Sequence, residues 1–141
     1  MESVVIDTNV LISGMLKQDS PPRAILDLAR QGRFSLITSE PLIDEFQRVA
    51  DKLTTKYPLI ARQREAIQYF LSIHSIGNPP HFNPAVVKQD PEDDRILECA
   101  LAGHASYIVS GNKHLTGLGQ FHGMRILPPA AFLQRILVIL L

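Results

Sequence analysis

Short apolar runs rich in β-branched residues alternate with helix-like stretches along the 141-residue chain, and this alternation constrains the fold most. Strands are expected over residues 3–6, 34–38, 107–110 and 124–127, with amphipathic segments between them. Such alternation is typical of an α/β fold built on a parallel sheet. The sequence therefore predicts one α/β domain over residues 1–141, a three-layer sandwich with a mostly parallel central sheet flanked by helices.

Serine and proline mark where helices are expected to begin. Ser20 precedes two prolines and Ser39 precedes Pro41, so each serine is predicted to cap a helix with its side chain. The segment 77–84 is rich in glycine and proline and is predicted to be a loop. Other expected elements are a helical turn over 10–16, helices over 58–72, 91–103 and 130–141, and a short strand over 73–76.

Asp7 comes directly after the first expected strand and is followed by Thr8 and Asn9. Ligands of parallel α/β sheets bind at the carboxyl ends of strands, so this position favours a functional role. No glycine-rich turn follows the strand, which disfavours a dinucleotide or phosphate-loop site. Aspartate is also a good helix cap, and position alone supports the two roles equally.

Four acids gather at the start of another expected helix. The helix dipole stabilises each nearby acid by about 0.3–1 kcal/mol, which accounts for one or two of them. Four adjacent carboxylates repel one another unless a cation lies among them, and Mg²⁺ and Mn²⁺ prefer oxygen ligands. The sequence therefore predicts a divalent-cation site that includes some of these residues: Asp90, Glu92, Asp93 and Asp94.

Further polar side chains are candidates for the same site. Glu45 lies beside Phe46 on an expected helix, so its carboxylate can reach inward at the edge of the apolar stripe. After the strand 107–110, the amide oxygen of Asn112 is expected to orient a metal-bound water, and Ser110 to bond an acidic neighbour or the backbone. Gly-Asn is also common in ordinary turns, so a plain turn remains an alternative for this segment.

The cysteine and the histidines give weaker signals. The single cysteine, Cys99, excludes a disulfide framework and a multi-cysteine zinc site, fits a reducing cytosol, and is expected in the core beside Ala100. The five histidines show no metal-binding spacing and are expected on the surface or in loops.

Three motifs together resemble the PIN domain over essentially the whole chain. They are the opening segment 4–13 (VVIDTNVLIS), the segment 90–102 (DPEDDRILECALA) and the segment from Tyr107 to Leu115. The chain is most similar to the PIN group assigned to the toxins of toxin–antitoxin systems, related to VapC toxins. The resemblance implies a Rossmann-like parallel sheet and a metal-dependent endoribonuclease that hydrolyses RNA.

The resemblance also implies an acidic quartet, which falls on Asp7, Glu45, Asp93 and the position held by Asn112. Asp93 is preferred to its neighbour Asp94 because the family's aspartate precedes a helix alanine by seven residues, as Asp93 precedes Ala100. Relatives commonly carry aspartate where this chain has Asn112. Asp7, Glu45 and Asp93 are expected to bind Mg²⁺ or Mn²⁺, with Asp94 as an additional ligand and Thr8, Asn9 and Ser110 in support.

The formal net charge is zero, yet the two signs are segregated along the chain. Five of the fourteen acids lie within residues 90–98, whereas residues 46–64 carry five basic side chains and one acid. Basic groups outside an acidic metal pocket are expected to hold the RNA backbone. The candidates are Arg48, Lys52, Lys56 and Lys113.

The apolar residues of the tail are expected mainly to pack on the sheet, and some of them to serve a homodimer or an antitoxin protein. They are Phe132, Leu133, Ile136, Leu137 and Leu140. No signal peptide is apparent and the tail is far shorter than the ~20 residues of a membrane span, which predicts a cytoplasmic protein.

Two alternatives stay open at this level. A metal-binding phospho-acceptor domain of the receiver type needs an aspartate that ends the middle strand, and the expected strand 73–76 is followed by Gly77 and Asn78. A degenerate PIN domain that binds RNA or a protein without cleaving is the stronger alternative, because Asn112 replaces the fourth acid.

Overall fold

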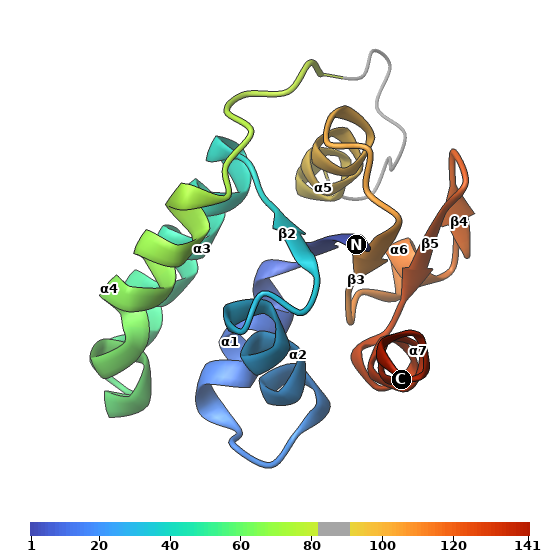
Figure 1. Ribbon diagram of the computed structural model, residues 1–141. Helices are drawn as coiled ribbons and strands as arrows, with labels where there is room; N and C mark the ends of the chain where they lie inside the picture. The colour runs from blue at the N-terminus through green and yellow to red at the C-terminus, as the bar shows by residue number, and fades with distance from the viewer. Residues whose placement is uncertain (82–90) are drawn as a thin grey trace.

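A single mixed sheet organises the computed structural model, which describes residues 1–81 and 91–141 (Figure 1). Within these residues the strand order is β2-β1-β3-β5-β4, and all neighbours are parallel except β5 and β4. The predicted α/β fold with a mostly parallel central sheet is confirmed. The strands are β1 (Ser3–Ile6), β2 (Ser35–Ile37), β3 (Tyr107–Val109), β4 (Gln120–Phe121) and β5 (Met124–Leu127).

Helices cover both faces of this sheet. α1, α2 and α7 lie on one face and α5 on the other, while α3 and α4 form an antiparallel pair beside β2 (Figure 1). The helices are α1 (Thr8–Leu16), α2 (Pro21–Arg30), α3 (Glu40–Leu53), α4 (Pro58–Ile73), α5 (Pro91–Ala102), α6 (Lys113–Thr116) and α7 (Pro129–Leu140).

The strand register brings two polar chain segments to the same edge of the sheet. Ile6, the last residue of β1, pairs with Val109, the last residue of β3. The backbone N–H of Asp7 then donates to the carbonyl of Val109 at 2.9 Å. Asp7 and Ser110 therefore both stand at the carboxyl edge, one residue beyond their strands.

The core consists of two clusters of buried side chains, because alternate strand residues face opposite sides of the sheet. Val4 and Ile6 face the larger cluster, and Val5 faces the smaller one. In the larger cluster the rings of Phe34 and Phe132 meet edge to face, with centroids 5.7 Å apart. The smaller cluster is built mainly from α5, the central strands and β5.

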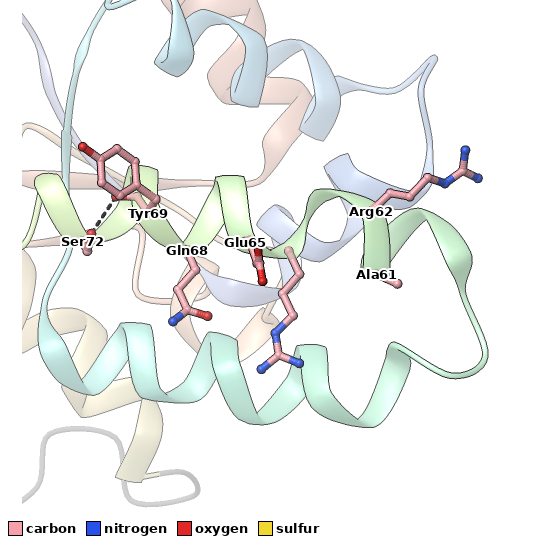
Figure 2. A pocket seen from close by; sticks show the side chains of 7 residues that line it. Ala61, Arg62, Glu65, Gln68, Tyr69 and Ser72 are labelled. Carbon is pink, nitrogen blue, oxygen red and sulfur yellow. Dashed lines mark hydrogen bonds between the residues drawn. The ribbon is translucent and has the colours of Figure 1, made fainter.

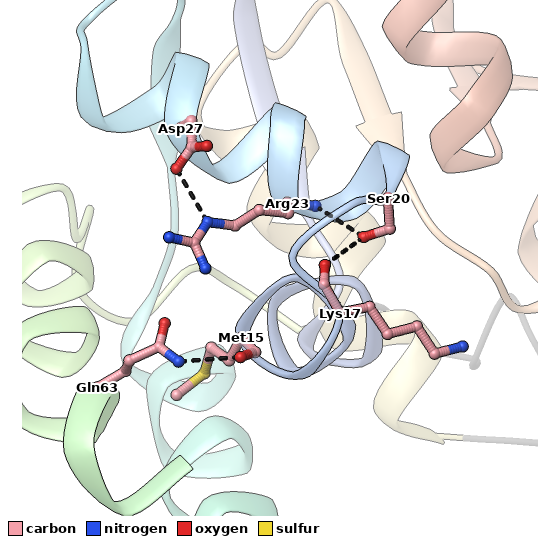
Figure 3. Close-up of polar contacts among 6 residues, drawn as sticks. All are labelled: Met15, Lys17, Ser20, Arg23, Asp27 and Gln63. Atoms are coloured by element: carbon pink, nitrogen blue, oxygen red, sulfur yellow. Dashed lines mark hydrogen bonds and ion pairs between the residues drawn. The ribbon is translucent and has the colours of Figure 1, made fainter. Parts of the chain in front are cut away.

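Polar contacts fix the connection between α1 and α2 (Figure 3). The Ser20 hydroxyl donates to the Lys17 carbonyl at 2.7 Å and accepts from the Arg23 N–H at 3.4 Å, so the predicted Ser20 cap is confirmed. Gly14 allows the two helices to approach closely, since a Cβ there would lie 2.9 Å from the Pro22 carbonyl oxygen. The side chain of Gln63 on α4 donates to the Met15 carbonyl at 2.9 Å and ties α4 to the end of α1.

The structure corrects several local expectations. The helical turn over 10–16 is a full helix that begins at Thr8. Ser39 stands at the N-cap position of α3, but its side chain makes no capping hydrogen bond. The strand over 73–76 is wrong: α4 runs to Ile73, the chain then turns, and a single bridge joins Ser75 to Thr38.

Residues 77–81 of the predicted loop have no regular structure, and the rest of that loop lies outside the described residues. Among residues 1–81 and 91–141, no helix combines the length and the apolar character needed to cross a membrane. The predicted helix at the C-terminal end is confirmed as α7, and its Phe132 and Ile136 are buried in the larger cluster.

Candidate functional site

The carboxylate of Asp7 is buried at the carboxyl edge of the sheet, with only 3% of the residue exposed. Asp7 stands at the N-cap position of α1, yet its side chain makes no capping hydrogen bond. Its Oδ2 instead accepts a hydrogen bond from the Ser110 hydroxyl at 2.7 Å. Its position in the sequence allowed Asp7 either a functional role or a role as a helix cap. The prediction that its side chain caps the helix is therefore wrong.

Ser110 connects the ends of β1 and β3. Its hydroxyl donates to Asp7 and accepts from the backbone N–H of Asn112 at 3.0 Å. A hydroxyl has one proton and two lone pairs, so both contacts can form at once. Ser110 is fully buried, and the contacts fix its rotamer and the orientation of the Asp7 carboxylate.

Asn112 extends this set of contacts to α5. Its side-chain N–H₂ donates to both carboxylate oxygens of Asp93, at 3.0 and 3.1 Å. Its side-chain oxygen accepts from the backbone N–H of His114 at 2.8 Å and caps α6. Because a backbone N–H must face an acceptor, the amide orientation is determined. The oxygen that was expected to orient a water therefore caps α6 with one of its two lone pairs, and its role toward a water stays a prediction.

Asp93 completes a chain of hydrogen bonds through four residues, Asp7, Ser110, Asn112 and Asp93, which we call the Asp7–Asp93 network. Asp93 and its neighbour Asp94 are both buried, with 3% and 2% exposed. Asp93 faces Asn112, so the network reaches α5 through Asp93. Of the other predicted acids at this helix start, Asp90 lies outside the described residues.

Glu45 lies on α3 and lines a cavity of about 490 Å³ between α3 and α5. We call this cavity the α3–α5 cleft. The beginning of α3 follows β2 and approaches α5 near the carboxyl edge of the sheet (Figure 1). Glu45 is half-buried, whereas its neighbour Asp44 is exposed. The lining residues are Pro41, Asp44, Glu45, Arg48 and Arg95.

The predicted metal ligands are only partly gathered. Among the described residues, no three histidine, cysteine, aspartate or glutamate side chains lie close enough to hold a metal ion together. The network does connect two buried carboxylates, Asp7 and Asp93, by hydrogen bonds. Mg²⁺ is usually held by one or two carboxylates with several waters, so this oxygen donor set fits Mg²⁺ or Mn²⁺.

The remaining predicted residues lie around the network. Thr8 is buried at the start of α1, while Asn9 is exposed. The predicted RNA-binding side chains are all exposed, but they are spread over the molecule, since α3 runs away from α5 (Figure 1). Arg48 lies in the α3–α5 cleft, Lys52 follows further along α3, Lys56 lies past its end, and Lys113 begins α6.

An ion pair on α5 was not predicted from the sequence. Glu98 is buried, with 2% exposed, and its carboxylate contacts the Arg95 guanidinium. The Nδ1 atom of His81 lies 3.2 Å from the same carboxylate oxygen. The spacing of Arg95 and Glu98, three residues apart on a predicted helix, is a signal that would have found the pair.

Cys99 behaves as predicted for a core residue. It is fully buried in the smaller cluster. Burial raises the pKa of its thiol from 9.0 to about 11, against a smaller opposite effect of the Ser39 hydroxyl. The thiol is therefore neutral at physiological pH, which disfavours a nucleophilic role. Of the histidines, four are exposed as expected, and His74 is half-buried.

A cavity of about 600 Å³ lies on α4 (Figure 2). All of its lining residues belong to this one helix, and the side chain of Arg62 extends outward from it (Figure 2). The Arg64 guanidinium at its edge pairs with Asp51. The cavity contains none of the predicted site residues, so volume alone does not identify the site.

Comparison with known proteins identifies a protein family and a relative. The sequence pattern of the PIN domain matches residues 3–114, which include every member of the Asp7–Asp93 network. An uncharacterized protein of Methanocaldococcus jannaschii is 32% identical to the chain over 118 residues. That alignment covers 82% of this chain and 74% of the archaeal protein.

Proposed function

The chain belongs to the PIN domain family, whose members are generally nucleases, and we propose that it is a metal-dependent endoribonuclease that hydrolyses RNA phosphodiester bonds. The observation that carries the proposal is the Asp7–Asp93 network. It joins two buried carboxylates from β1 and α5 at the carboxyl edge of the sheet, where α/β enzymes keep their chemistry.

Asp7 and Asp93 would hold Mg²⁺ or Mn²⁺, with Glu45 and Asp94 as further ligands directly or through water. When bound, such an ion supplies a Lewis acid for the phosphate and lowers the pKa of a water molecule. Ser110 donates to Asp7 and Asn112 donates to Asp93, so each carboxylate is held in one orientation. Outer partners of this kind usually support metal affinity and activity.

Basic side chains around the network would hold the RNA backbone in place. Arg48, Lys52, Lys56 and Lys113 are all exposed and suited to phosphate contacts. Replacing Lys52 and Lys56 by alanine should flatten the salt dependence of RNA binding. An unchanged slope would remove these two residues from the interface.

We further propose that the protein is the toxin of a toxin–antitoxin pair, acts in the cytoplasm, forms a homodimer and binds an antitoxin protein. The tail supports a protein contact, because Leu137, Val138 and Ile139 of α7 are 43–68% exposed although they are apolar. Val138→Lys should convert a dimer into a monomer in light scattering. This substitution spares Phe132 and Ile136, which belong to the core.

The decisive test is cleavage of single-stranded and structured RNA with Mg²⁺ or Mn²⁺. Asp7→Asn should abolish cleavage, because it removes one of the two buried carboxylates of the network. Asp19→Asn, on an exposed residue of the loop between α1 and α2, is the matched control and should cleave like the wild type. Cleavage that persists in Asp7→Asn would refute the carboxylate mechanism.

A degenerate domain that binds without cleaving is the second candidate. It is supported by the contact between Asn112 and Asp93, because the neutral amide occupies both oxygens of that carboxylate. This candidate predicts RNA binding without cleavage by the wild type in either metal. Cleavage by the wild type that Asp7→Asn abolishes would exclude it.

A further inference from the structure

We infer that the α3–α5 cleft is a phosphate-binding site for RNA, and that Arg95, oriented by the buried Glu98, is its anchor. The inference rests on the proposed function, since it concerns the substrate of the same site. It adds Arg95 as a binding residue and Glu98 as a positioning residue, and neither belongs to the acidic quartet.

The first observation is that Glu98 is a buried acid with two basic neighbours. Its side chain is only 1% exposed, and the carboxylate contacts the Arg95 guanidinium and His81 Nδ1. A buried carboxylate is costly unless it is paired, so Glu98 holds its partners in a defined place. The consequence is that the Arg95 guanidinium is fixed by the protein before any ligand arrives.

The second observation is that Arg95 also remains partly open to solvent. Its side chain is 31% exposed and lines the α3–α5 cleft. A guanidinium has five N–H donors in a planar fork, so the contacts with Glu98 and with His81 Nδ1, both made by one nitrogen, leave donors for a phosphate. Arg48 lines the same cleft from α3, so both guanidiniums would be available to one bound phosphate.

The third observation concerns where the cleft lies. Arg95 follows Asp93 by two residues on α5, and Glu45 lines the cleft from α3. A phosphate held by Arg95 would therefore be close to Glu45, whereas Asp93, which points to another side of α5, does not line the cleft. The phosphate in the α3–α5 cleft can belong to a nucleotide next to the one being cleaved. Its binding would then fix which phosphodiester bond of the RNA lies at the carboxylates.

The cavity on α4 is the natural comparison, because it also contains arginines (Figure 2). Its residues come from one helix and form no contact with the network. Arg62 there is exposed and its side chain extends away from the helix (Figure 2), whereas Arg95 is anchored by a buried acid. Arg62→Gln thus removes an equal charge from a site that we do not expect to bind RNA.

The test measures binding of a fluorescently labelled single-stranded oligoribonucleotide to the full chain carrying Asp7→Asn, so that binding is separated from cleavage. Adding Arg95→Gln should weaken binding about 10-fold, because a charge-assisted contact is lost. The slope of log affinity against log salt should fall by about 0.7. Arg95→Lys should keep the slope and lose part of the affinity, and Arg62→Gln should change neither.

Glu98→Gln tests the positioning role. It should weaken binding with Arg95 present and have no further effect in Arg95→Gln, a result that a general loss of structure would not produce. Thermal unfolding identifies any variant that does not fold, and Glu98→Asp then replaces it. If Arg95→Gln binds RNA like Arg62→Gln, the inference is wrong.

The two proposals fail in different ways. Cleavage by the wild type together with unchanged binding by Arg95→Gln would overturn the phosphate site and leave the nuclease intact. Absence of cleavage together with binding that depends on Arg95 would overturn the nuclease and leave the phosphate site.

Discussion

Replacing Asn112 by aspartate tests how the network is held together. The Asn112 amide lies 3.0 and 3.1 Å from the two oxygens of Asp93, and its own oxygen caps α6. Aspartate keeps the capping oxygen but replaces the donor by a second carboxylate oxygen. Asn112→Asp therefore changes one attractive contact into a repulsive one and leaves the shape almost unchanged.

The magnitude follows from Coulomb's law. Two unit charges about 3 Å apart repel by about 1.4 kcal/mol in water and by about 5.5 kcal/mol at an effective dielectric constant of 20. Asp93 is buried and Asn112 half-buried, so the cost should fall between these limits. We expect Asn112→Asp to lower the free energy of unfolding by about 2–5 kcal/mol at neutral pH without metal. The loss should shrink in acid, when one of the two carboxyls takes up a proton.

A divalent cation should reverse this effect, because it turns the repelling pair into ligands. At a concentration 100 times its dissociation constant, an ion that binds only the folded state adds about 2.7 kcal/mol. The assay is urea unfolding in EDTA and in Mn²⁺, with Asn78→Asp on an exposed loop residue as control. If Asn112→Asp is as stable as the control in EDTA, or gains no more from Mn²⁺ than the wild type, the reasoning is refuted.

Three further predictions concern stability. Ser110→Ala removes the hydrogen bonds to Asp7 and to the Asn112 N–H and should lower the free energy of unfolding in urea by about 2–4 kcal/mol. The control Ser72→Ala, at an exposed serine on α4, should lower it by less than about 0.5 kcal/mol. Equal losses would refute the role of Ser110. Because the pKa of Cys99 is raised to about 11 in the folded state, its stabilising contribution is full below pH 9 and is lost as the pH rises toward 11. The wild type should therefore lose about 2 kcal/mol more than Cys99→Ala between about pH 8 and about pH 10.5, and parallel losses would contradict the shift. Gly14→Ala places a Cβ 2.9 Å from the Pro22 carbonyl oxygen and should cost about 1–3 kcal/mol, whereas Gly111→Ala meets no atom within 4 Å and should change stability by less than about 0.5.

The sequence predicted where the candidate residues lie better than what they contact. The placement of Asp7 and Ser110 was predictable because polar residues directly after buried parallel strands share one edge of the sheet. The direction of the Asn112 amide was not predictable in this way. It depends on α6, a helix of four residues, whereas the Gly-Asn pattern is equally typical of an ordinary turn.

The hairpin of β4 and β5 shows a similar limit. Its two-residue turn, His122 and Gly123, has positive φ at both positions, 49° and 82°. Such turns favour asparagine or aspartate followed by glycine, so histidine gave no hairpin signal. The distance between Glu45 and α5 could not be predicted from the sequence either, because it depends on how two helices distant in sequence pack together.

The division of the core into two clusters has a consequence for how the protein opens. α5 contributes only to the smaller cluster, whereas α1, α2, α4 and α7 share the larger one. Regions with separate packing can open independently, so the amide protons of α5 should exchange with solvent before those of α1 and α4. α5 carries Asp93, Arg95 and Glu98. Each opening of α5 would therefore separate these residues from Asp7 and Ser110, which would stay in place at the ends of β1 and β3. Warming should therefore inactivate the protein reversibly at a temperature where most of the sheet is still protected.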